Sequence, residues 1–210
     1  MLKKISNKME NVKIYISNII DFINQDWEDY ERINAYVELW RKPYLHYFHK
    51  CVKFVGKLNS TDINHVMNMM NNHKIKKQIS IDSVLPIDNI QKIKQIKMND
   101  MDVSLYYQDN KFPWPYSKRY SYLITMIHKI SNDHYIYIEK TIDYNDDSIN
   151  TDENVLWNYT NTISYEKKDD HILTTMTCKF DLGDTYIPET LMDNVVKSMS
   201  VLYKHWNQLL

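Results

Sequence analysis

The sequence predicts an α+β domain, in which a run of antiparallel strands is followed by one long C-terminal helix. Residues 187–209 space their apolar side chains at steps of three and four, as an amphipathic helix does. Residues 102–182 carry several β-type runs that are separated by short polar turns. Because the strands are grouped and do not alternate with helices, the pattern favours an antiparallel sheet over a parallel one.

Composition narrows the class of protein. The chain has 210 residues and a mass of 25.4 kDa, which fits one domain with a sizeable core. A formal net charge of -1 gives no electrostatic reason to expect a nucleic-acid partner. Hydrophobic residues make up 43% of the chain, which excludes general disorder. The two glycines, Gly56 and Gly183, are too few for a phosphate-binding glycine-rich loop.

Cysteine and histidine usage predicts neither a metal site nor a cofactor. Cys51 and Cys178 have no metal-type spacing, and the eight histidines form no ligand group. The N-terminus lacks the features of a signal peptide, and no apolar run approaches the roughly 20 residues of a membrane span. We therefore expect a cytoplasmic protein with reduced thiols.

The N-terminal part combines helical and strand patterns. Residues 11–36 predict one or two helices, with acidic residues on a solvated face after the last apolar position. Residues 37–41 predict a short strand, and residues 44–58 a longer strand that bends near Gly56. The helical pattern rests on the spacing of Val12, Ile16, Ile19, Ile23 and Trp27.

The next segment contains a helix start. Residues 59–62, Asn-Ser-Thr-Asp, supply N-cap chemistry for a helix that runs through Met70. Strand signals dominate from about Ile79 onward. Residues 90–97 place isoleucines at a three-residue step, which fits a helix better than a strand, and the sequence leaves both alternatives open.

The rest of the chain predicts two hairpins and the terminal helix. Residues 131–133 form a plausible hairpin turn, and residues 168–170 form another. Pro188 fits the first turn of the terminal helix, where a missing N–H does no harm. The predicted strands are residues 102–108, 119–130, 134–142, 155–167 and 171–182, with an acidic loop at 143–153.

Three landmarks together resemble a known family. Residues 113–119 contain two prolines around a tryptophan, then Ser117 and Arg119, and this is similar to the P-W-P-x-S-x-R junction of START (steroidogenic acute regulatory protein-related lipid transfer) domains. The strand at 47–58 with its following helix start also matches. So does the glycine-containing loop at 180–188, which ends in Ile-Pro.

The resemblance covers residues 27 to 209 and implies a fold and an activity. START domains have a helix-grip fold, in which a curved antiparallel sheet wraps around a long C-terminal helix and encloses a tunnel for one lipid. We therefore expect residues 27–210 to form a START-like lipid-binding domain. Residues 1–26 are expected to form an N-terminal helical extension that packs on it.

The phosphatidylcholine carriers of this family imply a headgroup site. They hold choline in an aromatic box, and Tyr159 matches the tyrosine of that box, while Asn161 matches the neighbouring amide. The two residues are two apart on a strand, so their side chains share a face. Tyr159 also fits an ordinary core position.

The remaining headgroup positions match less closely. A strict alignment puts Gln108 and Ser121 at aromatic positions, with Tyr107 and Tyr122 each one residue away. Lys76 stands near the family's phosphate-binding arginine, but the tryptophan and aspartate of that pattern are missing. Lys76 also fits a solvated surface cluster with its neighbouring lysines.

The resemblance also assigns a lid and a membrane contact. The apolar stripe of the terminal helix is expected to roof the tunnel, although such a stripe also fits ordinary core. The preceding loop is expected to insert into a membrane during lipid exchange. The lid residues are Leu191, Val195, Met199, Leu202 and Trp206, and the loop residues are Leu182, Tyr186 and Ile187.

Together these features predict a cytoplasmic, monomeric lipid-transfer protein, not an enzyme. It would carry one phospholipid, with phosphatidylcholine as the first choice, and contact membranes transiently. The sequence leaves three alternatives. One is a carrier of sterol or ceramide, and another is a lipid-sensing module in a larger assembly. The third is a helix-grip enzyme, which would need an ionisable pair facing the cavity.

Overall fold

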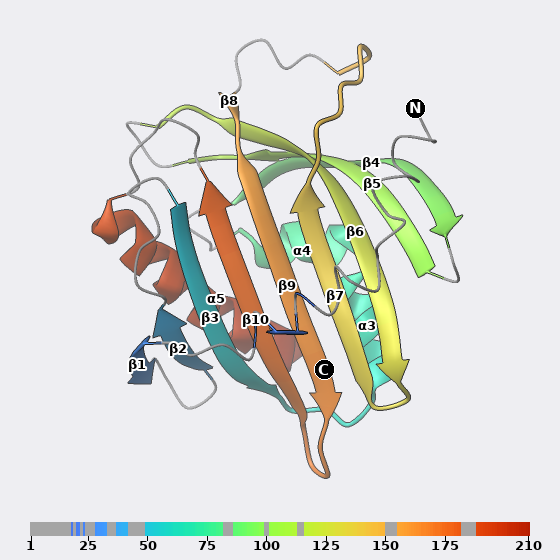
Figure 1. Cartoon of the computed structure of the whole chain (residues 1–210), viewed down its shortest axis with the longest axis vertical. Coiled ribbons are helices and arrows are strands. Elements are labelled where there is room, and N and C mark those ends of the chain that lie inside the picture. Colours follow the sequence, from blue (N-terminus) through green and yellow to red (C-terminus); the bar gives the residue numbers. More distant parts are fainter. Residues whose placement is uncertain are drawn as a thin grey trace.

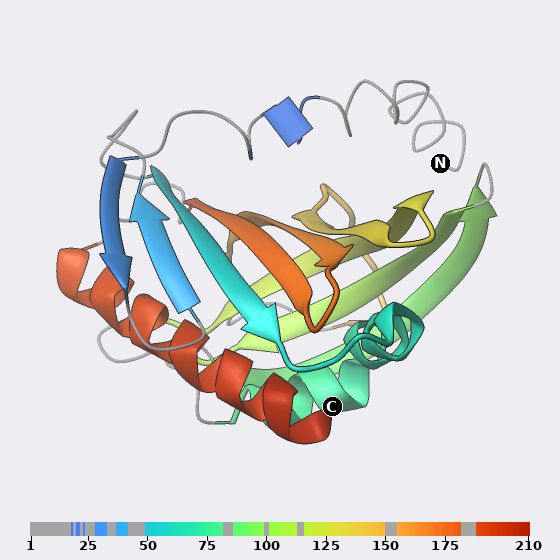
Figure 2. The same ribbon diagram turned by 90° about the horizontal axis from the view of Figure 1, so that it is seen from below.

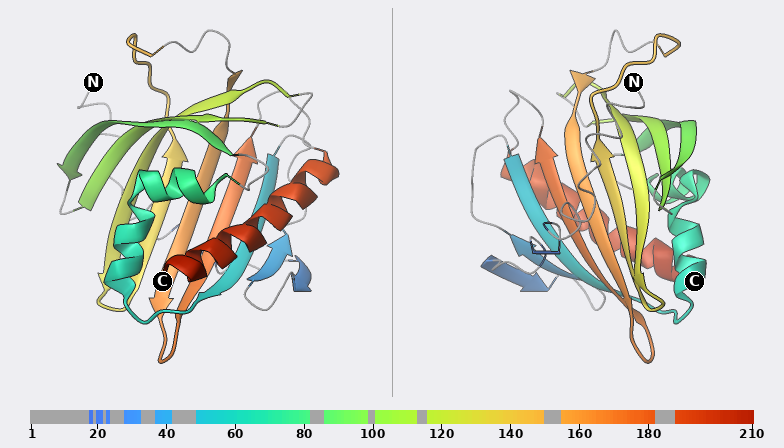
Figure 3. Two further views of the ribbon diagram at one scale, coloured as in Figure 1. Left: turned by 180° about the vertical axis from the view of Figure 1, so that it is seen from behind. Right: turned by 45° about the vertical axis from the view of Figure 1, so that its right-hand side comes forward.

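A curved antiparallel sheet with three helices on its concave face dominates the fold (Figures 1 and 2). The computed structural model describes residues 18, 20, 21, 23, 28–32, 37–41, 49–81, 86–98, 101–112, 116–149, 155–181 and 188–210. The long helix α5 (Glu189–Leu209) crosses this face, and the short helices α3 (Ile63–Met70) and α4 (His73–Ile79) lie on the same side (Figure 3). This arrangement confirms the predicted helix-grip fold.

The sheet has the strand order β1-β2-β3-β10-β9-β7-β6-β5-β4, and every neighbouring pair in this order is antiparallel. The short strand β8 lies off this path and pairs in parallel with β6. The strands are β1 (Glu28–Arg32), β2 (Val37–Arg41), β3 (His49–Leu58), β4 (Ile87–Met98), β5 (Met101–Asn110), β6 (Arg119–Ser131), β7 (His134–Thr141), β8 (Val155–Leu156), β9 (Asn158–Lys167) and β10 (Ile172–Asp181).

The two short helices begin at side-chain caps. The Asp62 carboxylate accepts a hydrogen bond from the backbone N–H of His65 at 3.0 Å, so the predicted helix start is confirmed. The Asn72 side chain accepts from the N–H of Lys74 at 3.1 Å and caps α4 in the same way. The sequence pattern did not indicate α4, because its many lysines leave only a weak apolar stripe.

The helical prediction for residues 11–36 is wrong at residues 28–32, which form the edge strand β1. Their acidic residues suggested a solvated helix face. Charged residues are also common on edge strands, because they oppose pairing with another chain. Charge alone therefore could not separate the two structures.

The ambiguous segment at residues 90–97 is part of strand β4. Its pairing with β5 is interrupted between Ile87 and Asn89 and again between Lys92 and Lys94. A bulge inserts one extra residue and reverses which side chains face a given side of the sheet. The three-residue spacing of Ile90 and Ile93 therefore arises from a bulged strand and not from a helix.

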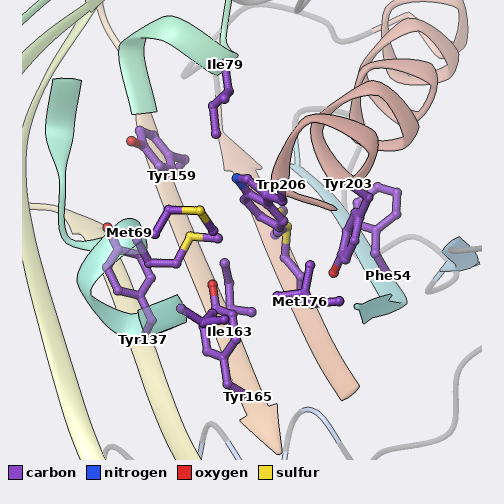
Figure 4. Packing of buried hydrophobic residues seen from close by; sticks show 14 of the residues in the cluster. Phe54, Met69, Ile79, Tyr137, Tyr159, Ile163, Tyr165, Met176, Tyr203 and Trp206 are labelled. Carbon is purple, nitrogen blue, oxygen red and sulfur yellow. The ribbon is translucent and has the colours of Figure 1, made fainter. Parts of the chain in front are cut away.

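Apolar side chains form a core on each face of the sheet. The larger core lies on the concave face, beneath the helices, and includes Phe54, Tyr165 and Met176 (Figure 4). The smaller core lies on the convex face, where Ile20 and Ile23 pack against four strand residues. Those four residues are Val103, Met126, Ile136 and Ile138. The boundary at residue 26 stays a prediction.

The C-terminal half of α5 is fastened to strands β3 and β10. The Tyr203 hydroxyl is hydrogen-bonded to the Thr174 hydroxyl in the buried interface. The Asn207 side chain accepts from the N–H of Asn59 at 2.6 Å and donates to the carbonyl of Lys57 at 3.1 Å. These bonds fix one end of α5 against the sheet.

Some predicted features lie outside the described residues: the Pro113-Trp114-Pro115 turn and most of the N-terminal helical pattern. In the described part of the chain, none of the helices has the length and apolar character needed to cross a bilayer.

Candidate functional site

A cavity of about 170 Å³ lies between the concave face of the sheet and the helices α4 and α5. Most of its wall is apolar, and side chains from α3, α5 and the sheet supply that surface. The apolar lining residues include Met70, Ile163, Met176, Met199, Leu202 and Trp206. Trp206 and Met199 line this space and do not fill it.

The size of the cavity sets what fits inside it. An engineered cavity of about 150 Å³ in another protein holds one benzene molecule, and pockets for drug-sized ligands span about 300–1,000 Å³. The present cavity therefore accommodates a small apolar group. A larger molecule requires the walls to move outward.

One wall of the cavity carries a buried ion pair. The Glu139 carboxylate on β7 is 3% exposed and forms an ion pair with the Lys76 ammonium of α4. The Tyr137 hydroxyl donates to Glu139 Oε2 at 2.7 Å, and the Tyr159 hydroxyl donates to Glu139 Oε1. Lys76 Nζ also donates to the Tyr137 hydroxyl at 3.2 Å. The carboxylate is thus held by one cation and two phenols.

These contacts fix the charge state of the group. Burial alone would raise the pKa of Glu139, but Lys76 and the hydrogen bonds from Tyr159 and Tyr137 hold that pKa below its ordinary value. Burial, together with the negative charge of Glu139, raises the pKa of Tyr159 and of Tyr137 well above the ordinary value. At neutral pH the carboxylate is therefore ionised and both phenols are neutral donors.

Gln108 and Trp206, which both line the cavity, each hold a buried polar atom with no hydrogen-bond partner among the described residues: the Gln108 side-chain carbonyl oxygen and the Trp206 indole N–H. The Gln108 amide nitrogen donates to Asn110 Oδ1 at 2.8 Å and to the Tyr159 hydroxyl at 3.4 Å. In Figure 4 the indole nitrogen of Trp206 points away from Tyr203, toward the side where Tyr159 lies. A buried donor and a buried acceptor in one cavity suit a polar ligand group.

The structure brings three of the predicted headgroup residues together in the cavity wall: Tyr159, Asn161 and Lys76. The Trp157 ring lies beside Tyr159, with the two ring centroids 4.4 Å apart. Asn161 Oδ1 accepts from the Cys178 thiol at 3.3 Å.

Tyr107 and Tyr122 lie on the other face of the sheet, away from the cavity. Gln108 faces the cavity from the same strand as Tyr107, and a step of one residue along a strand reverses the face. The Tyr107 ring lies 5.4 Å from that of Tyr122, and Tyr144 packs on Tyr122 at 5.2 Å. The strict alignment, which favoured Gln108 over Tyr107, thus identifies the residue that lines the cavity.

Four of the five predicted lid residues line the cavity, and their role as a lid stays a prediction. Val195, Met199, Leu202 and Trp206 line the cavity, whereas Leu191 is buried in the surrounding core. The predicted membrane loop, with Leu182, Tyr186 and Ile187, falls outside the described residues.

Sequence reasoning missed Glu139 and Tyr137. A signal was present, because a glutamate directly follows the apolar run of residues 135–138 inside a predicted strand, and Tyr137 precedes it by two positions on the same face. The partner of Glu139, Lys76, is 63 residues away in sequence, so only the fold shows the pair. Among the described residues, no group of three histidine, cysteine or acidic side chains is arranged to hold a metal ion.

A curved sheet that holds a C-terminal helix over an apolar cavity defines the helix-grip class of fold, to which START domains belong. The chain superposes on human StAR-related lipid transfer protein 5 with a TM-score of 0.74, over 97% of this chain and 96% of that one, at 11% identity. Human STARD10 gives a TM-score of 0.71 over 90% of this chain and 77% of that one, at 11% identity.

A bacterial structure shares the fold as well. The STAR-related lipid transfer protein of Xanthomonas axonopodis (fragment 25–204) gives a TM-score of 0.67 at 14% identity, over 86% of this chain and 99% of that one. No model of a sequence family and no curated protein sequence matches the chain. The likeness therefore lies in the fold.

Proposed function

We propose that this protein binds one lipid in the cavity under α5 and transfers it between membranes. The observation that carries the proposal is the cavity itself, which is apolar along most of its wall and has polar side chains gathered around Glu139. An amphipathic ligand needs an apolar surface for its chain and polar groups for its head. The helix-grip fold that the chain shares with lipid transfer proteins supports the same function.

Energetics favour transfer over permanent capture. Each buried methylene group gains about 0.8 kcal/mol relative to water, so a lipid with about thirty of them gains roughly 25 kcal/mol. A bilayer provides nearly the same gain. The net preference of a lipid for the protein over the membrane is therefore small, and the protein supplies a dry path between the two.

Binding a complete lipid requires the cavity to widen, because about 170 Å³ is below the size of a drug-sized pocket. The C-terminal half of α5 is fastened by Tyr203 and Asn207. The N-terminal half carries Val195 and the cavity-facing Ser198. We expect the N-terminal half to move outward when lipid enters.

Phosphatidylcholine is the cargo that the sequence resemblance predicts. The Trp157 and Tyr159 rings in the cavity wall offer aromatic faces to a quaternary ammonium group. Asn161 lies on the same strand face as Tyr159, and Lys76 is a cation in the same wall. The aromatic rings and Asn161 suit the choline part of a phosphocholine headgroup, whereas the pairing of Lys76 with Glu139 counts against its phosphate.

A sterol or ceramide is the second candidate, and the Glu139–Lys76 ion pair favours it. Glu139 already neutralises the charge of Lys76 and accepts a hydrogen bond from the Tyr159 hydroxyl. A phosphate would have to displace a buried carboxylate from its partners. An uncharged head would leave the pair intact.

The competing enzymatic function needs an ionisable pair that faces the cavity, and Lys76 and Glu139 form such a pair. A useful general base has a pKa near the working pH, whereas the contacts of Glu139 lower its pKa. The pair therefore suits a fixed structural charge better than a proton carrier. A lipid-sensing module differs from a carrier in retaining its lipid, and a transfer assay separates the two.

The decisive experiment is transfer of labelled lipids between donor and acceptor liposomes. The Val195→Phe variant adds a ring inside the cavity and should abolish transfer while the protein stays folded. The control, Lys204→Phe, adds the same ring at an exposed position of α5. No transfer by the wild type, with any lipid class, would reject the proposed function.

The headgroup is tested separately. Tyr159→Ala should reduce phosphatidylcholine transfer if the tyrosine contacts choline. Retained transfer would remove Tyr159 from the headgroup site and leave the carrier function intact. Native mass spectrometry of the purified protein would identify the bound cargo.

The cellular setting proposed for such a carrier is the cytoplasm, where a monomer reaches each membrane through transient contact. One exposed apolar side chain stands at the end of α4, near the cavity: Ile81, which is 71% exposed. It is a candidate contact with the bilayer, in addition to the predicted loop.

A further inference from the structure

The charged side chains of the cavity wall cancel one another. Of the described residues that line the cavity, Lys76 is the one cation and Glu139 is the one anion. They form an ion pair, so the described part of the wall is neutral. Among the described lining residues, a phosphate group that enters this space finds no uncommitted positive charge.

Glu139 also opposes an anion directly. Its carboxylate is almost fully buried, and both of its oxygens are occupied by Lys76, Tyr137 and Tyr159. A phosphate close to Lys76 would stand close to Glu139 as well, because the two side chains are in contact. Repulsion between like charges is strong where water is excluded. Phosphate binding would therefore require the buried carboxylate to lose its cation.

The buried polar atoms of Gln108 and Trp206 favour an uncharged head. The Trp206 indole N–H needs an acceptor, and the Gln108 side-chain carbonyl needs a donor. Neither atom is charged, and the described residues offer neither of them a hydrogen-bond partner. A hydroxyl group is the smallest chemical group that both donates and accepts.

We propose that Glu139 selects the cargo by charge, so that the cavity takes a lipid with an uncharged, hydroxyl-bearing head and rejects one with a phosphate. The proposal rests on the proposed lipid-binding function. Trp206 and Gln108 would form the hydrogen bonds to the head. Glu139 would keep the Lys76 ammonium group in an ion pair, so that it cannot bind phosphate. Glu139 thereby determines which lipid head is bound, because it neutralises the charge of Lys76.

The test uses amphiphiles that share one chain and differ in the head: hexadecanol, hexadecyl phosphate and hexadecylphosphocholine. Each is added at the same small mole fraction to dioleoylphosphatidylcholine vesicles, the protein is incubated and re-isolated, and the retained amphiphile is measured by mass spectrometry. The wild-type protein should retain hexadecanol at least about tenfold over either phosphate compound, as expected for an uncompensated charge near a buried carboxylate.

The Glu139→Gln variant keeps the shape of the side chain and an acceptor oxygen for one of the two tyrosine hydroxyls, but it releases Lys76. It should retain at least about tenfold more hexadecyl phosphate than the wild type does, while it still retains hexadecanol. Glu166→Gln is the matched control, because it breaks an exposed ion pair with Lys168 by the same chemical change. Trp206→Phe should lower hexadecanol retention several-fold by removing the indole donor.

Two results would overturn the proposal: equal retention of hexadecanol and hexadecyl phosphate by the wild type, or no gain of hexadecyl phosphate in a folded Glu139→Gln variant. The wild-type comparison decides the matter if that variant does not fold. Retention of no amphiphile and no vesicle lipid by the wild type would reject the proposed function together with this inference.

Discussion

The ring of Tyr203 on α5 occupies the space where a side chain on residue 56 would begin. A Cβ atom placed on Gly56 of β3 would lie 2.3 Å from Cε1 of Tyr203, far inside van der Waals contact. Helix and strand therefore meet at a point where only glycine fits. The sequence suggested a bend at this glycine, whereas the structure gives close approach as the reason for it.

Gly56→Ala should destabilise the protein by about 1–3 kcal/mol, because the added methyl group forces the Tyr203 ring out of its buried position. Urea unfolding followed by circular dichroism measures this change. Lys57→Ala, at the exposed neighbouring position, is the control and should have little effect. Full stability of Gly56→Ala would mean that α5 shifts freely on the sheet.

Removing Lys76 should lower the free energy of unfolding more than removing the charge of Glu139. Lys76→Met leaves a buried carboxylate without its cation and should cost about 3–5 kcal/mol of unfolding free energy. Glu139→Gln should cost less, because the Lys76 side chain is 23% exposed and its ammonium group can turn toward water.

The double variant Lys76→Met/Glu139→Gln completes this cycle. It should recover much of the stability lost in Lys76→Met, since no unpaired charge then remains buried. Additive losses in the double variant would contradict a direct ion pair. Chemical unfolding at neutral pH measures all four proteins.

Acid should remove the contribution of the ion pair in a defined pH window. The folded-state pKa of Glu139 lies below its ordinary value of 4.5, so the folded state binds fewer protons than the unfolded chain. The stabilisation is then complete above about pH 4.5 and is lost as the pH falls through the folded-state pKa. The difference in unfolding free energy between wild type and Glu139→Gln should shrink in that window and stay constant near neutral pH. A difference that changes between pH 6 and 8, measured by thermal unfolding, would assign the titration to another group.

The fold was largely predictable from the sequence because its strongest signals are local. The apolar stripe of α5, the Asp62 cap and the hairpin turns each lie within a few residues. The exceptions have local causes as well. The bulges in β4 disturbed the two-residue alternation, and the charges of β1 fit an edge strand as well as they fit a helix.

The candidate site was only partly predictable, because it depends on pairs of residues that are distant in sequence. The resemblance to START domains identified Tyr159 and Asn161, strand periodicity put them on one face, and helix periodicity identified the α5 stripe. The contact between Lys76 and Glu139 spans 63 positions and has no local pattern. The unpartnered atoms of Gln108 and Trp206 become visible only when all their neighbours are known.

The Cys178 thiol offers a direct test of cavity opening. It is 5% exposed, lines the cavity and donates to Asn161. A buried thiol reacts with a maleimide only when the structure opens locally, so its labelling rate reports that opening. In a Cys51→Ser background, labelling should be slow in buffer and several-fold faster with vesicles, because lipid exchange moves α5 away from the sheet.

Labelling should become slow again once the protein is loaded with lipid and separated from the vesicles, since the acyl chain then covers the thiol. Cys178→Ser in the same background controls for reaction at other groups. The rate is followed by intact-protein mass spectrometry. If vesicles leave the rate unchanged while lipid transfer proceeds, then lipid enters without exposing strand β10, and outward movement of the N-terminal half of α5 is not the way in.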